Sequence, residues 1–104
     1  MAEGGDAEIV LEVLSVFQTD TATRLGSLQA GLASGNTAQV RTQAHSIKGS
    51  ASQVGALGFA ALCQRIEHEA EHGQSDALTA MVRELETSFA EVCRAITAGQ
   101  DAMR

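Results

Sequence analysis

Apolar residues recur along the chain at alternating steps of three and four, which is the spacing of one buried face of an α-helix. Four segments carry this pattern, and each of them ends near a glycine. No segment shows the two-residue alternation that is typical of a strand. The pattern therefore predicts an all-α fold in which four amphipathic helices, joined by short turns, form an antiparallel up-down-up-down four-helix bundle.

The first predicted helix begins at Asp6, a candidate N-cap, and continues to Ala33. A polar run at residues 18–21 interrupts its apolar stripe. Thr and Asp can cap a new helix, but the apolar phase is the same on both sides of this run. We therefore predict one long helix, either straight or kinked near residues 18–21. The stripe consists of Val10, Leu14, Phe17, Thr21, Leu25, Leu28 and Leu32.

Glycines and polar caps set the other predicted boundaries. A second helix follows a cap at residues 36–37 and ends at Gly55, and a third runs from about residue 56 to Gly73. A fourth begins at Ser75 and ends at Gly99. The expected buried positions of these helices are Val40, Ala44, Ile47, Ala51 and Val54, then Phe59, Leu62, Cys63, Ile66 and Ala70, and finally Leu78, Val82, Leu85, Phe89, Val92 and Ile96.

Length and charge narrow the classes of function. At 104 residues, the chain is expected to form one domain, residues 1–104, with frayed ends at 1–5 and 100–104, and to be a monomer. A net charge of -6 argues against non-specific binding to nucleic acid or to anionic lipid. No apolar run approaches the roughly 18 to 20 residues of a membrane span, and the N-terminus lacks the basic start of a signal peptide. A cytoplasmic location is the default expectation.

The two cysteines, Cys63 and Cys93, are far apart and form no C-x-x-C motif. Each falls on or beside an apolar helical stripe. We therefore expect two reduced, buried thiols rather than a disulfide or a pair of metal ligands.

His45 lies off the apolar stripe of the second helix. Helical spacing places it on one exposed face together with Arg41, Lys48, Gly49 and Ser52. Glycine inside a helix is disfavoured by roughly 1 kcal/mol relative to alanine, so helix formation does not explain Gly49. A neutral imidazole can act as a nucleophile without a dedicated base. The cation Lys48 and the missing side chain of Gly49 beside it favour the approach of a bulky, anionic group. The alternative interpretation is that His45 is simply solvated.

The segment His45-Ser-Ile-Lys48-Gly49-Ser-Ala-Ser-Gln-Val-Gly-Ala56, followed by Leu-Cys-Gln-Arg-Ile-Glu67, resembles the motif of histidine-containing phosphotransfer (HPt) domains of multistep phosphorelays. The resemblance implies that His45 accepts a phosphoryl group from the aspartyl phosphate of a receiver domain and passes it to the aspartate of another receiver. In that family the phosphorylated atom is Nε2, and the domain has no ATP-dependent autokinase activity. It needs no cofactor, because Mg²⁺ belongs to the receiver.

The resemblance also implies roles for the neighbours of His45. Lys48 compensates phosphoryl charge and Gly49 permits the approach of the receiver. Glu67 stands where some members have a glutamine that orients the histidine, so it either holds the imidazole or is solvated. Three further residues of the second helix are candidates for the docking rim, namely Arg41, Thr42 and Ser52.

The implied partners are receiver domains of response regulators or of hybrid histidine kinases. A chain that starts at Met1 and has no linker favours a free-standing intermediary, and a domain excised from a hybrid kinase would have the same pattern. The alternative function is a helical interaction module whose histidine is never phosphorylated.

Residues 68–72 read His-Glu-Ala-Glu-His and match H-E-x-x-H, the zinc-protease motif. No third histidine follows, Gly73 is expected to end the helix at once, and the phase of the fourth helix places the acidic Glu91 beside solvent. We therefore reject zinc proteolysis and expect a solvated, charged helix end without a metal, to which adventitious metal binding is the alternative.

Overall fold

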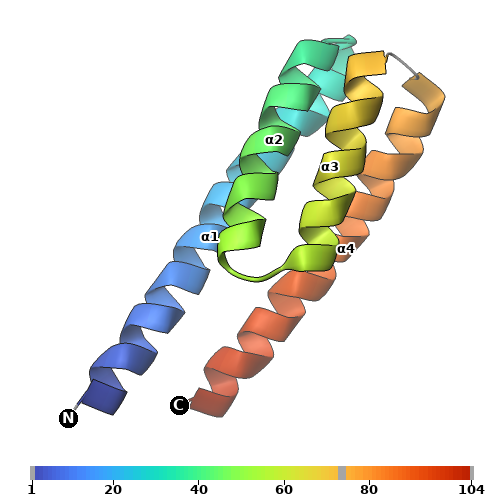
Figure 1. Ribbon diagram of the computed structural model, residues 1–104. Coiled ribbons are helices and arrows are strands. Elements are labelled where there is room, and N and C mark those ends of the chain that lie inside the picture. Colours follow the sequence, from blue (N-terminus) through green and yellow to red (C-terminus); the bar gives the residue numbers. More distant parts are fainter. Residues whose placement is uncertain (1, 73–74, 104) are drawn as a thin grey trace.

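The computed structural model describes residues 2–72 and 75–103, and all four elements in this part of the chain are α-helices. The helices are α1 (Ala2–Ser34), α2 (Thr37–Gln53), α3 (Leu57–His72) and α4 (Ser75–Met103). They form the antiparallel four-helix bundle that the apolar pattern predicts. Figure 1 shows that α1 and α4 extend beyond the shorter α2–α3 pair and that both chain ends lie at the same end of the bundle. The molecule is accordingly elongated, with extents of 52 × 20 × 19 Å.

Most of the buried residues are those whose spacing marked them as the inner faces of the helices. Ala60 of α3 is buried although it was not predicted, and four predicted residues of α1 and α4 are only partly buried, namely Leu14, Leu32, Phe89 and Val92. The predicted stripes of α2 and α3 are buried throughout, except for Val54 and Leu62, which are half-buried against the core. Val10, near the free end of α1, is instead 47% exposed. Figure 1 shows that the N-terminal part of α1 extends past α2 and α3, where fewer helices can cover its apolar stripe.

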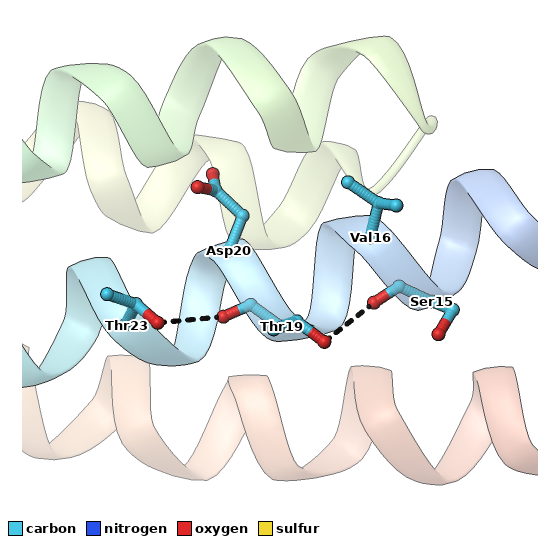
Figure 2. A pocket seen from close by; sticks show the side chains of 5 residues that line it. All are labelled: Ser15, Val16, Thr19, Asp20 and Thr23. Atoms are coloured by element: carbon cyan, nitrogen blue, oxygen red, sulfur yellow. Dashed lines mark hydrogen bonds between the residues drawn. The ribbon is translucent and has the colours of Figure 1, made fainter.

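The α1 helix continues without a break through the polar run at residues 18–21. Thr19 and Thr23 donate hydrogen bonds to the carbonyls of the residues four positions earlier, Ser15 and Thr19, at 3.1 and 3.2 Å, as Figure 2 shows. Their hydroxyls therefore bond within the helix instead of capping a new one. Because such bonds often bend a helix, a kink at this point stays a prediction.

The turns at the two ends of α2 form at the polar cap and the glycines that predict them. Asn36 caps α2, since its side-chain oxygen accepts a hydrogen bond from the backbone amide of Gln39 at 3.1 Å. Gly35 and Gly55 have φ angles of +73° and +80°, the left-handed conformation that glycine adopts without strain when a helix ends. These two turns fix the ends of α2, and thereby the position of its exposed face.

Two predicted boundaries were wrong. Asp6 lies inside α1, which already begins at Ala2, and Gly99 lies inside α4, which continues to Met103. The chain has alanine and glutamate on both sides of the Gly4-Gly5 pair, and alanine, glutamine and methionine around and beyond Gly99. These residues are good helix formers, so the glycines do not stop the two helices. Fraying of residues 1–5 and 100–104 stays a prediction, although most of these residues are helical here. Gly73, the predicted end of α3, lies outside the described residues, and the last described residue of α3 is His72.

Thr21 is the one described polar residue that is fully buried in the core. Its hydroxyl has no hydrogen-bond partner among the described residues. A buried hydroxyl without a partner carries a desolvation cost of about 1–3 kcal/mol. The stripe at this position therefore tolerates a polar residue at the expense of stability.

We expect Thr21→Val to stabilise the protein by about 1 kcal/mol, because valine has nearly the same shape and helix propensity but no hydroxyl to desolvate. Urea unfolding followed by circular dichroism measures the change. Thr23→Val is the control, since that hydroxyl is exposed and bonded, and it should change stability by no more than about 0.5 kcal/mol. A loss of stability in Thr21→Val would contradict the assignment of an unsatisfied hydroxyl.

Candidate phosphotransfer site

The candidate site lies on the outer faces of α2 and α3, which pack against each other. The inner face of α2 packs in the core through four buried residues, namely Val40, Ala44, Ile47 and Ala51. The residues on the opposite side of α2 therefore face outward. His45 is consequently exposed, with 67% of its side chain accessible, and Gly49 is exposed one turn later.

Glu67 of α3 bridges the two charged or titratable side chains of this face. Its Oε2 lies 3.0 Å from His45 Nδ1, and its Oε1 accepts a hydrogen bond from Lys48 Nζ at 2.8 Å. The sequence left open whether Glu67 contacts His45 or is solvated, and in the structure it makes the contact. His45 and Lys48, one turn apart on α2, are thus held by a single carboxylate on the neighbouring helix.

The environment keeps Glu67 charged. Its pKa is lowered from the usual value, first by the hydrogen bond from Lys48 and then by the hydrogen bond from His45, while partial burial opposes the shift. An ionised carboxylate can only accept hydrogen bonds, so the His45 nitrogen that faces it must carry the proton. The neutral ring then bears its lone pair on Nε2, for which no hydrogen bond is found within the described part of the chain.

Gly49 leaves open space next to His45. A Cβ atom built at this position would meet nothing within 4 Å. Internal packing therefore does not require a glycine here, and its backbone is helical. The missing side chain leaves the surface beside the imidazole free for another molecule.

The remaining predicted site residues are placed but not joined to this cluster. Arg41, Thr42 and Ser52 are exposed on α2, and in the described part of the chain none of them has a hydrogen bond to His45. Ser52 lines a shallow groove between α2 and α3 together with Lys48 and Leu57. Its other lining residues are Ala60, Ala61, Gln64 and Arg65.

The α3 side of this groove was not predicted from the sequence. Leu57 is 69% exposed, which is unusual for a leucine at a helix start, and it shares the groove with Gln64 and Arg65. Helical spacing from Glu67 gives a signal that could have found Leu57 and Gln64, because residues 57, 60, 64 and 67 follow steps of three and four along one side of α3.

The cysteines take no part in the site. Both are free thiols, as predicted, but only Cys63 is buried, whereas Cys93 is half-buried. Burial raises the pKa of Cys63 to about 12, against a smaller lowering from Lys48. Cys63 is therefore a neutral thiol in the core at physiological pH.

The H-E-x-x-H segment forms the last turn of α3. His68 and His72 are exposed there, and Glu69 is half-buried. The exposure of both histidines agrees with the solvated helix end that the sequence predicts. None of the described helices is both long and apolar enough to cross a membrane.

Comparisons with known proteins identify the family of the chain. The family model described as "Hpt domain" matches residues 12–95. Among solved structures, the chain is similar to the crystal structure of histidine-containing phosphotransfer protein B (HptB) from Pseudomonas aeruginosa PAO1, with 32% sequence identity and a TM-score of 0.85. The alignment covers 90% of this chain and 82% of that one. A search of curated proteins returned no match. The family model spans all four helices and the His45 face, and we conclude that the chain belongs to the Hpt domain family.

Proposed function

We propose that this chain relays a phosphoryl group between aspartates of receiver domains, with His45 as the covalent carrier. The observation that supports this most is the hydrogen bond of the exposed ring: Nδ1 lies 3.0 Å from Glu67 Oε2, so the lone pair of the neutral imidazole is on Nε2. Membership of the Hpt domain family supports the same function.

In the proposed reaction, His45 Nε2 attacks the phosphorus of an aspartyl phosphate on the incoming receiver. The N–P bond forms as the acyl O–P bond breaks, and the receiver aspartate leaves as a carboxylate. The Nδ1 proton stays on the ring, where the negative charge of Glu67 stabilises the cationic imidazolium that forms. The reverse sequence delivers the phosphoryl group to the next receiver aspartate.

Lys48 would supply positive charge close to the transferring oxygens. In the structure its ammonium is paired with Glu67 at 2.8 Å, and its side chain is only 24% exposed. It is therefore held within one helical turn of His45 and needs little reorganisation to approach a phosphoryl oxygen. Mg²⁺ would be supplied by the receiver, and this chain would contribute no cofactor, ATP site or autokinase activity.

The proposed partners are the receiver domains of response regulators or of hybrid histidine kinases, which would dock over Gly49 with Arg41, Thr42 and Ser52 on the rim. We further propose that the protein acts as a monomer in the cytoplasm and binds neither nucleic acid nor membranes. The net charge of -6 supports the last of these points.

The transfer experiment incubates the protein with receivers phosphorylated with ³²P. We expect an acid-labile, alkali-stable label on the wild type and no label on His45→Gln. Arg83→Gln, an exposed change on α4, is the control and should be labelled like the wild type. If no receiver of the source organism labels the wild type, the interaction-module alternative replaces the relay.

Lys48→Ala should slow phosphoryl transfer about tenfold, because a charge-assisted contact to the transferring group is lost at a cost of roughly 1.4 kcal/mol. Rapid-quench measurement of the rate checks it. Lys48→Arg, which keeps the positive charge, should be less impaired. Equal rates for the alanine variant and the wild type would show that Lys48 has no charge role.

A further inference from the structure

The last turn of α3 gathers three potential metal ligands on one exposed patch. They are His68, Glu71 and His72, and one ligand atom from each lies within 4.8 Å of the others. The two imidazole rings face each other with their centroids 4.3 Å apart. Spacings of three and four residues place all three side chains on the same side of the helix. This cluster is separate from the His45–Glu67 pair.

In one of the two rings a backbone hydrogen bond decides which nitrogen is free to bind a metal. His72 Nδ1 lies 2.7 Å from the backbone carbonyl oxygen of His68. A carbonyl only accepts hydrogen bonds, so Nδ1 of His72 carries the proton and, in the neutral ring, Nε2 has the free lone pair. Metal-binding histidines are commonly fixed in this way, by donating the second ring N–H to a carbonyl or carboxylate.

Charge at this position also favours a cation. The three side chains lie at the C-terminal end of α3, where the helix dipole is negative. Glu71 adds a formal negative charge, and the chain as a whole carries -6. Two imidazole nitrogens and one carboxylate oxygen form a donor set that suits Zn²⁺ and its neighbours in the first transition row, whereas Mg²⁺ and Ca²⁺ prefer oxygen donors alone.

We propose that His68, Glu71 and His72 bind a divalent transition-metal ion of the Zn²⁺ class at the end of α3. Ligand atoms of one Zn²⁺ ion stand closer together than 4.8 Å, because each bond is about 2.0–2.2 Å long. The exposed side chains close this gap by changing rotamer. Water completes the coordination, since the described residues supply only these three ligands.

The assignment differs from the protease motif in the glutamate that it uses. In H-E-x-x-H the second residue, here Glu69, is the general base and not a ligand. The cluster at the end of α3 instead includes Glu71, a carboxylate that the protease motif does not use. The proposal is metal binding alone.

Isothermal titration of the full chain with ZnCl₂, after removal of metal by chelation, tests the proposal. We expect one Zn²⁺ per chain, at least tenfold weaker binding in His68→Ala and in His72→Ala, and several-fold weaker binding in Glu71→Gln. The control is Glu91→Gln, an exposed acidic residue of α4, which should bind like the wild type. MgCl₂ at the same concentration should not compete.

Two further observations make the outcome decisive. In NMR spectra, Zn²⁺ should shift the ring Cε1–H signals of His68 and His72 and leave that of His45 in place. Circular dichroism should be the same for all variants, because the three side chains are exposed. The proposal is overturned if the wild type binds no Zn²⁺, if both histidine variants bind it as the wild type does, or if His45→Gln abolishes binding. None of these results bears on phosphoryl transfer.

Discussion

Replacing Gly49 by leucine should slow phosphoryl transfer about 100-fold without unfolding the protein. The leucine side chain would occupy the open surface one turn from His45, where a receiver must bring its aspartyl phosphate within bonding distance of Nε2. A displacement of the reacting groups by about 1 Å can cost this much in rate. The fold should accept a leucine here, because Gly49 is exposed and a Cβ atom built at this position has nothing within 4 Å.

The stability of the same variant separates this steric effect from misfolding. Leucine in place of glycine within a helix should raise stability by about 0.5–1 kcal/mol. Gly26→Leu is the matched control, since Gly26 is an exposed glycine inside α1 with equally open surroundings. It should give the same gain in urea unfolding and transfer at the wild-type rate. Unchanged or faster transfer in Gly49→Leu would refute the steric role of the glycine.

Glu67→Ala should slow transfer about 10- to 100-fold, because it removes the acceptor of the Nδ1 proton and the partner of Lys48 in one change. The imidazole then rotates freely and can present either nitrogen. Mutation of a residue that orients a functional histidine through its second ring nitrogen typically costs about 10- to 100-fold in activity. The predicted loss is in the transfer rate, while the free energy of unfolding should fall by only about 1 kcal/mol, since both ion pairs are partly solvated.

Glu67→Gln is the informative comparison. Its amide oxygen can still accept the hydrogen bond from His45 Nδ1, although it cannot neutralise the charge of Lys48 or of a cationic ring. The rate of this variant should therefore lie between those of Glu67→Ala and the wild type. A purely structural role of Glu67 predicts instead that the rates of the two variants follow their stabilities, and that result would remove the orienting role.

Much of the fold could be predicted from the sequence because the helices share one long core. Residues such as Ile47 and Ile66 are fully buried where their three- and four-residue spacing places them. The helix ends were harder to predict, since a glycine stops a helix only if the chain also changes direction. At Gly55 it does, with φ at +80°, whereas Gly99 remains helical because α4 simply continues past the bundle.

The residues of the site that lie on one helix could be predicted from the sequence, whereas the contact between two helices could not. His45, Lys48 and Gly49 share one turn of α2, so helical spacing alone groups them. The contact with Glu67 depends on how α3 is set against α2, and a periodic pattern does not determine this axial position. Leu57 was missed for a related reason: its exposure follows from its place next to the Gly55 turn, not from its hydrophobicity.

The most direct test of the relay is to identify the atom that carries the phosphoryl group. Long-range ¹H–¹⁵N NMR of the uniformly ¹⁵N-labelled protein, phosphorylated by its receiver, distinguishes the two ring nitrogens of each histidine. The structure leads us to expect phosphorylation at Nε2 of His45, with Nδ1 still protonated and facing Glu67. Phosphorylation at Nδ1 of His45, or on His68 or His72, would contradict the account.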